Sequence, residues 1–321
     1  MTVTLTPDKS FTWVPGRGPR RESLARMRGK VALPKEPMGE AWFMGARREM
    51  FTYLRERPID ELTERELAVP LGEIASGNSC FGPMREWKLW LDYFATHLVP
   101  ICLRPSHRSL QEVLCTAVMA QYHSGFSDGP YREFGDDLLD TIGQCLMDES
   151  KWNGTKPVLE RMLYAQPSPH AIGWGWWEAS GDLSASLFFC LKYLRPVQVR
   201  AWVESVLAIS DPHWRAQLLV WLAGARRIIV DGRQPKEVFM QSPQIDWEGS
   251  HVLEGNYTGD YERPGNVPLV PEANCLEFRR AIQESLTSRI LDEWRRSIAA
   301  VDYLLGEAGH IVNSDNNEFR L

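Results

Sequence analysis

Gly181-Asp-Leu-Ser-Ala-Ser-Leu-Phe-Phe-Cys-Leu-Lys-Tyr-Leu194 opens the most strongly patterned part of this chain. The pattern continues as Arg195-Pro-Val-Gln-Val-Arg-Ala-Trp-Val-Glu-Ser-Val-Leu207 and, after a short gap, as Asp211-Pro-His-Trp-Arg-Ala-Gln-Leu-Leu-Val-Trp-Leu222. In each part apolar residues recur every three to four positions, which places them on one face of an α-helix. The stretch 181–232 therefore predicts three amphipathic helices, and their short connections predict that they pack as antiparallel neighbours.

Further helices are predicted on both sides of this stretch. The helical spacing of apolar residues holds through most of 41–230 and again through 273–306, where Asn274 and Glu277 resemble a capping box. No alternation of strands and helices is visible. The sequence predicts an all-α fold of irregular stacked helix pairs, either a HEAT-like solenoid or a large helical bundle, with a long irregular insert. No diagnostic repeat consensus is present, so the pattern indicates an architecture and no family.

The insert sets the expected division of the chain. In 231–272, Gly, Pro, Asn and acidic residues replace the helical pattern. A connection this long inside a compact domain is uncommon and is typical of functional segments. We predict a basic, Pro/Gly-rich arm (1–40) and a single all-α domain (41–321), made of a helical core (41–230), the irregular acidic insert (231–272), a C-terminal helical region (273–306) and a frayed tail (307–321).

The composition is that of an ordinary folded protein, with 44% hydrophobic and 24% charged residues. Its net charge of −6 argues against broad binding to nucleic acids or anionic membranes. The first residues lack the layout of a signal peptide, and no apolar run approaches the ~20 residues that span a bilayer. Six cysteines without a Cys-x-x-Cys pair predict free thiols in a reducing compartment. We therefore expect a cytoplasmic protein without a membrane partner.

The N-terminal arm is basic. Residues 9–35 contain eight Lys or Arg and one acid, Glu22, and the Pro and Gly residues of 1–40 predict no regular element there. One interpretation is a tether for an acidic partner or a phosphate backbone, which is the one route by which we expect nucleic acid to bind. The preferred interpretation is an arm wrapped on the surface, with its arginines paired to acids of the domain. A separate acidic patch on a predicted helix is expected to be solvated, with partner docking as its second interpretation: Asp136, Asp137 and Asp140.

The most suggestive place for chemistry is a Trp-rich loop before the first of the three helices. Trp174, Trp176 and Trp177 precede Glu178, and Asp182 follows at the helix start. Aromatic faces beside carboxylates suit a sugar ring or an extruded nucleobase, with Glu178 and Asp182 as acid–base groups. The alternative, which we favour, is a packing loop whose acids are stabilised by the positive end of the helix dipole.

Other chemical motifs are lacking in the sequence. The histidines show no metal-ligand spacing, and neither a GxGxxG motif nor a P-loop occurs, so no metal and no cofactor are expected. Ser79 and Cys80 lie in a Gly-bounded segment, 70–82, that we interpret as a loop. Cys80 has no positioned histidine in the sequence, which disfavours a role as a nucleophile.

The acids of the insert form the second candidate site. Between residues 231 and 272 there are eight acids and three bases. This excess predicts attraction to a basic surface and salt-sensitive association. The acids expected to contact such a partner are Asp246, Glu248, Asp260 and Glu262.

Two functions from different classes follow from these patterns. The first, which we expect, is a non-catalytic helical scaffold that binds another protein with a basic surface, as an adaptor or a toxin-neutralising, immunity-type partner. The second is an enzyme with a Trp-lined cleft that uses Glu178 and Asp182 on a carbohydrate or a nucleobase. The two differ in whether Trp174, Trp176 and Trp177 line an open concavity or pack in the interior.

Overall fold

The chain is mostly helical, which confirms the all-α prediction. Strands occur only as two short antiparallel pairs in the described part: β1 (Met38–Glu40) with β2 (Arg48–Met50), and β3 (Trp152–Asn153) with β4 (Lys156–Pro157). The computed structural model describes residues 10–40, 48–80, 85–107, 109–159, 162–163, 179–235, 245–253 and 268–301.

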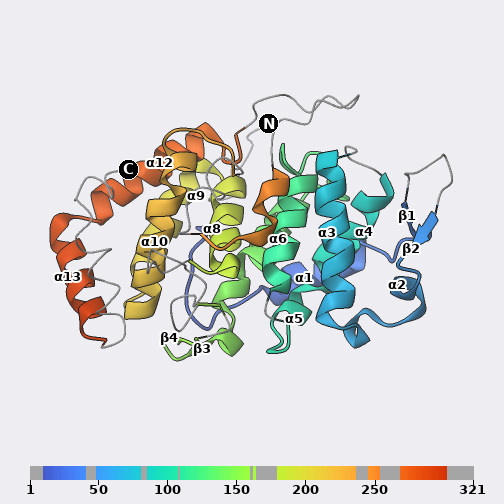
Figure 1. Ribbon diagram of the computed structural model, residues 1–321, viewed down its shortest axis with the longest axis horizontal. Coiled ribbons are helices and arrows are strands. Elements are labelled where there is room, and N and C mark those ends of the chain that lie inside the picture. The colour runs from blue at the N-terminus through green and yellow to red at the C-terminus, as the bar shows by residue number, and fades with distance from the viewer. Residues whose placement is uncertain are drawn as a thin grey trace, which may run out of the picture.

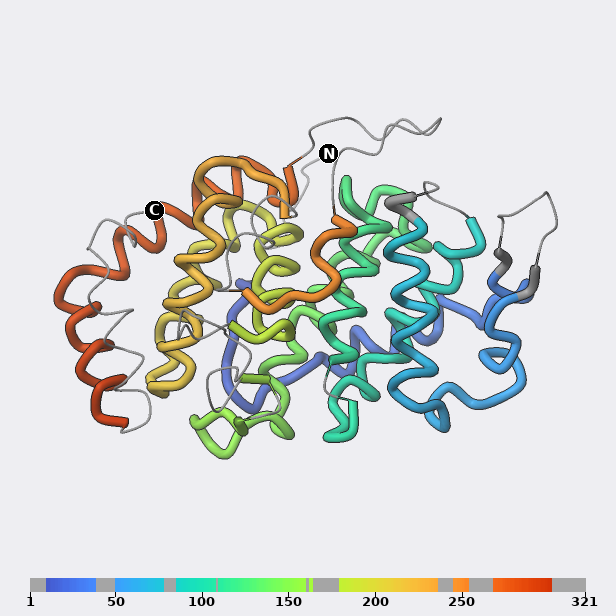
Figure 2. The backbone as a smooth tube through the Cα atoms, in the orientation of Figure 1, coloured from blue at the N-terminus to red at the C-terminus, as the bar shows by residue number. Residues whose placement is uncertain are grey.

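A row of helices runs along the longest axis of the molecule (Figure 1). The smooth backbone trace shows the same side-by-side arrangement (Figure 2). Helix α6 contacts both α3 and α8, and α10 contacts α13. Between α8 and α10 the rings of Phe188 and Trp221 lie 5.0 Å apart. We call this arrangement the helix row; its members are α3 (Glu64–Cys80), α6 (Leu110–Gln121), α8 (Gly181–Tyr193), α10 (Pro212–Ile229) and α13 (Ser288–Ala299).

The remaining helices pack on this row. Helix α4 contacts α6, α7 and α12 contact α8, and α12 packs along α9. These helices are α1 (Arg21–Lys30), α4 (Arg85–His97), α7 (Phe134–Thr141), α9 (Pro196–Leu207) and α12 (Glu272–Ser285). Shorter elements complete the described part: α2 (Tyr53–Glu56), α5 (Val99–Cys102) and the 3₁₀ helices η1 (Ile59–Glu61), η2 (Ile142–Met147), η3 (Glu149–Lys151) and η4 (Glu248–Leu253).

The three helices predicted from 181–232 are α8, α9 and α10. Ser180 caps α8, because its hydroxyl accepts a hydrogen bond from the Leu183 amide. Asp211 caps α10 by accepting from the backbone amides of His213 and Trp214. Pro196 and Pro212 are the first residues of α9 and α10, where a missing amide hydrogen has no helical partner to lose.

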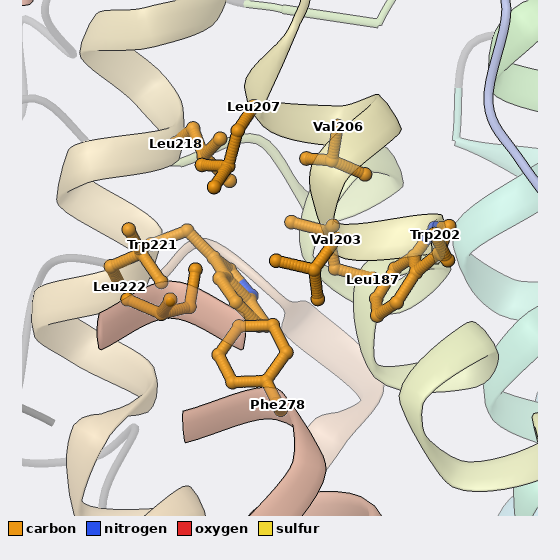
Figure 3. Close-up of a pocket in the computed structure, with 10 residues that line it drawn as sticks. Leu187, Trp202, Val203, Val206, Leu207, Leu218, Trp221, Leu222 and Phe278 are labelled. Carbon is orange, nitrogen blue, oxygen red and sulfur yellow. The ribbon is translucent and has the colours of Figure 1, made fainter. Parts of the chain in front are cut away.

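Aromatic side chains fill the space between these helices. The rings of Trp221 and Phe278 approach each other edge to face at 6.0 Å, and both are fully buried (Figure 3). The void left among the side chains of α8, α9, α10 and α12 is about 10 Å³, no larger than one water molecule. This part of the core is therefore packed and offers no space for a ligand.

Helix α3 corrects the expectation of a loop at 70–82, because it continues through Pro70 as far as Cys80. An internal proline costs about 3 kcal/mol. Burying each large aliphatic side chain stabilises the fold by about 1.5–3 kcal/mol, so burial of several of them along one face of α3 outweighs the free-energy cost of the proline. Gly77 serves close packing, since a Cβ there would lie 2.0 Å from the Trp87 ring. The buried stripe consists of Leu67, Leu71 and Ile74.

The N-terminal arm contains a regular helix, α1, which corrects the prediction of no regular element in 1–40. The preferred interpretation of the arm, in which its arginines pair with acids of the domain, is confirmed. Arg26 forms two hydrogen bonds to the Asp137 carboxylate, at 2.8 and 2.5 Å. Arg20 lies 3.4 Å from Asp140. Asp137 is fully buried, so the expectation of a solvated acidic patch is wrong at this position. The arm therefore pairs with two of the acids of α7, Asp137 and Asp140.

Trp13 fixes the start of the arm to the core. Its ring is 1% exposed and lies edge-on to Trp202 at 5.6 Å and to Trp214 at 6.1 Å. Its indole nitrogen donates to the Gly143 carbonyl at 2.8 Å, and its backbone amide donates to the Ser205 hydroxyl. The arm therefore joins η2 to α9 and is a structural part of the domain.

Replacing Trp221 with alanine is expected to lower the free energy of unfolding by about 3–5 kcal/mol, because the buried ring leaves a cavity. Chemical denaturation followed by circular dichroism measures this change. Val197→Ala is the control, since Val197 is 71% exposed and its truncation removes little packing. An equal stability of Trp221→Ala and the wild type would contradict the packing in Figure 3.

Arg26→Gln is expected to destabilise the fold by about 1–3 kcal/mol, because it removes hydrogen bonds from the buried Asp137 carboxylate. Arg21→Gln, at an exposed position of the same helix, is expected to change stability little. The same denaturation experiment compares the two variants. Identical unfolding curves for both would mean that the arm does not stabilise α7.

Candidate functional site

The structure describes three of the residues singled out in the sequence: Asp182, Asp246 and Glu248. Asp182 lies in the first turn of α8, while the other two lie in and just before η4. These three meet around the first turn of α6. The other candidates lie outside the described residues: Trp174, Trp176, Trp177, Glu178, Asp260 and Glu262.

Both oxygens of the Asp182 carboxylate face protein groups. Oδ1 accepts a hydrogen bond from the Glu112 backbone amide at 3.0 Å, and Oδ2 lies 3.7 Å from the ammonium nitrogen of Lys151. Burial raises the pKa of Asp182 to about 6, although Lys151 opposes the shift by favouring the charged form. Asp182 thus joins α6, α8 and η3.

Lys151 extends this contact into a short polar chain. It is 3% exposed and donates to the side-chain oxygen of Gln111, whose amide nitrogen donates to the Ser186 hydroxyl at 2.7 Å. Each buried polar group in the chain therefore has a partner, as buried polar groups require. Lys151 is the last residue of η3, next to Trp152. The residues beside it in the sequence did not indicate that its side chain would be buried.

Glu112, like Lys151, is a residue of this site that sequence reasoning missed. It lies in the first turn of α6, and its Oε1 accepts a hydrogen bond from the Glu248 backbone amide at 2.8 Å. Burial raises its pKa to about 8, and the charges of Asp182, Asp246 and Glu248 add to this shift. The sequence contained one signal for this position. Helix α6 is apolar around most of its circumference, so an acid on it is expected to contact neighbouring elements of the protein.

The insert reaches this site through the segment 245–253. Ile245 forms a β-bridge with Ala179, and the Asp246 amide donates to the Ala179 carbonyl at 3.0 Å. Trp247 stacks on Phe188 of α8 at 5.4 Å and donates to the Thr116 hydroxyl of α6 at 2.9 Å. In Figure 1 this orange segment passes in front of α8 and α6. The segment is therefore anchored by apolar packing on helices far away in sequence.

Glu112, Asp182, Asp246 and Glu248, which we call the carboxyl cluster, thus converge with Lys151 as a nearby cation. Two of its members have pKa values that differ, about 8 for Glu112 and about 6 for Asp182. Such a pair can hold or exchange a proton near neutral pH. Across the described ranges, His, Cys, Asp and Glu side chains form no group suited to a metal ion.

A separate pocket of about 200 Å³ opens where the arm meets α7 and α9. Its lining combines acids in and just before α7 with Arg26 of the arm and Arg195, the residue that precedes α9. The carboxyl cluster contributes nothing to its lining. The lining residues that carry charge are Arg26, Glu133, Asp136, Asp137, Asp140 and Arg195.

Comparison with protein-family models, with curated proteins and with solved structures finds no match to this chain. The structure therefore defines only the fold class of this protein, which is all-α and organised around the helix row. No helix in the described ranges is long and apolar enough to cross a bilayer.

Gly181→Ala is expected to destabilise the protein by about 1–3 kcal/mol through crowding of a packed site. An added Cβ would lie 1.9 Å from Glu112 Oε2 and 2.8 Å from the Asp246 carbonyl oxygen, so segment 245–253 would have to move. Gly72→Ala is the matched control, because a Cβ there meets nothing within 4 Å. It is expected to stabilise helix α3 by about 0.5–1 kcal/mol. Thermal unfolding of both variants checks the opposite signs.

Proposed function

We propose that this protein is a non-catalytic helical scaffold that binds another protein, as an adaptor or a toxin-neutralising, immunity-type partner. The helix row supports this proposal, because a line of packed helices offers a long surface that stays rigid on binding. We regard the row as a HEAT-like stacking of irregular helix pairs. The filled core of α8, α9, α10 and α12 also favours binding at the surface over binding in an interior cavity.

The observation that carries the proposal is the way segment 245–253 sits on the row. Its apolar side chains Ile245, Trp247, Val252 and Leu253 are buried, while Glu248 is exposed. An acidic surface on a segment with fixed anchors binds at a lower entropic cost than a free loop. This arrangement favours a partner with a basic surface.

The carboxyl cluster gives a further electrostatic reason to expect a partner with a basic surface. Asp246 and Glu248 lie close enough to Glu112 for their charges to act on it. Lys151 is oriented inward, toward Asp182 and Gln111. A basic partner would therefore meet an excess of negative charge, which speeds association and makes it sensitive to salt.

We also propose the cytoplasm as the compartment. Cys102, Cys115, Cys145, Cys190 and Cys275 are free and buried. Burial raises the pKa of each of these thiols, which keeps them protonated and slow to react. Free thiols of this kind are typical of a reducing compartment.

A second candidate function is acid–base catalysis on a carbohydrate or a nucleobase. One specific observation favours it: Glu112 is partly buried and its pKa is raised to about 8, which suits a general acid near neutral pH. The enzymatic hypothesis derived from the sequence uses Glu178 and Asp182 as its acid–base groups. The internal contacts of Asp182 count against it as the reacting group and favour Glu112 in that role.

The scaffold proposal is tested by neutralising two acids of segment 245–253, the half-buried Asp246 and the exposed Glu248. Tagged wild-type protein is used to isolate a partner from cells of the source organism, and the purified partner is then titrated against variants. The double variant Asp246→Asn/Glu248→Gln is expected to weaken binding at least tenfold at about 50 mM salt and to reduce its salt dependence. The matched control is Asp292→Asn/Glu293→Gln, which neutralises two exposed acids of α13.

Equal loss of affinity in both double variants would contradict docking at segment 245–253. Activity assays on oligosaccharides and on single-stranded nucleic acid separate the second candidate. An activity that disappears in Glu112→Gln or Glu178→Gln, with the fold intact by circular dichroism, would replace the scaffold proposal with the enzymatic one.

A further inference from the structure

The cavity of about 200 Å³ between the arm, α7 and the start of α9 has walls that are fixed in place. Phe11 lines it from the arm, and two residues later the Trp13 indole nitrogen donates to the Gly143 carbonyl at 2.8 Å. Arg26 lines it from α1 and is held by its two hydrogen bonds to the Asp137 carboxylate. The cavity is therefore preformed, which lowers the entropic cost of filling it.

The size and the apolar part of the lining suit a short alkyl stem. A water molecule takes about 30 Å³ of the liquid, so the cavity has room for a ligand of about seven non-hydrogen atoms, the size of an arginine side chain. Phe11 and Leu139 are both buried and supply the apolar surface on which such a stem packs. Polar groups surround this surface, as in most small-ligand sites.

Negative charge prevails in the rest of the lining. Asp137 and Asp140 are paired with arginines of the arm. The side chains of Glu133 and Asp136 are exposed, and among the described residues neither forms a hydrogen bond or an ion pair. Two carboxylates at the exposed edge of the cavity are therefore left without a cation to compensate them.

The arginines of the lining do not make it a site for an anion. The charge of Arg26 is compensated by Asp137, and Arg195 Nε already donates to Gln198 Oε1 at 3.2 Å. An anion would approach the two unpaired carboxylates and be repelled, whereas a cation would be attracted. Concave surfaces lined by charge of one sign concentrate ligands of the opposite sign.

We propose that this cavity binds an organic cation, a guanidinium or ammonium head group on a short alkyl stem. The head group lies at the carboxylates of Glu133 and Asp136, and the stem packs on Phe11 and Leu139. This chemistry occurs in free diamines and guanidino compounds and also in the arginine and lysine side chains of a polypeptide. The site is separate from segment 245–253, so the inference goes beyond the scaffold function and does not depend on it.

Calorimetric titration of the full chain tests the site with three probes. Agmatine represents a free small cation, and N-acetyl-arginine amide represents an arginine side chain of a polypeptide. N-acetyl-citrulline amide is the matched control, because it has nearly the same shape without the charge. At about 20 mM salt at least one cation is expected to bind, at least tenfold more tightly than the citrulline probe. Its affinity is expected to fall severalfold at about 300 mM salt, because the carboxylates are exposed.

Two variants change the charge of the lining in opposite directions. Glu133→Gln/Asp136→Asn is expected to weaken cation binding at least tenfold while leaving the fold intact by circular dichroism, since neither side chain has a partner to lose. Arg195→Gln removes a charge of the same sign as the ligand and is expected to strengthen binding about two- to fivefold. A substitution that merely damaged the site would not increase affinity.

The control variant is Asp292→Asn/Glu293→Gln on α13, which changes the net charge equally and is expected to leave binding unchanged. A preference for agmatine would identify a free small cation as the ligand, and a preference for N-acetyl-arginine amide would identify a polypeptide side chain. Failure of both cations to bind, equal binding of the citrulline probe, equal loss in the two double variants, or weaker binding by folded Arg195→Gln would each overturn the proposal.

Discussion

The structure depends on the complete burial of helix α8. Every residue from Gly181 to Lys192 is buried, so the helix has no face toward solvent along this length. Neighbours must therefore cover it from every direction, and α6, α12, η2 and the aromatic side chains of α10 do so. The amphipathic pattern of the sequence indicates one apolar face, but the position of α8 in the helix row requires that its polar face also be buried.

Polar groups on α8 consequently need partners inside the protein, and these partners tie the fold together. Lys192 donates to the Leu269 carbonyl at 2.8 Å, and burial lowers the pKa of Lys192 to about 8. The Asn274 amide donates to the carbonyls of Leu191 and Leu194, both at 2.7 Å. Asn274 was expected to cap its own helix and instead caps the end of α8, because unsatisfied carbonyls at a buried helix end are costly.

The two acidic sites of the chain differ in the charged groups that surround their carboxylates. On α7 the carboxylates of Asp137 and Asp140 meet arginines of the arm, so the arm neutralises them. At the carboxyl cluster the acids lie near one another, and burial together with the neighbouring charges raises the pKa of Glu112. Burial raises the pKa of Asp140, but Arg20 opposes that shift by favouring the charged form, whereas the acids around Glu112 add to its shift.

The sequence by itself determined α8, α9 and α10, because their apolar periodicity depends on residues within one or two helical turns. It also singled out Asp182 in one candidate site and Asp246 and Glu248 in another, from local composition. Only the tertiary structure decided that Glu112 and Lys151 complete that site, that α3 passes through Pro70, and that the arm forms α1. Each of these outcomes depends on contacts between distant parts of the chain, such as Glu112 with Asp182 and Arg26 with Asp137. Local propensity is weak compared with the burial that such contacts produce, so no local pattern predicts them.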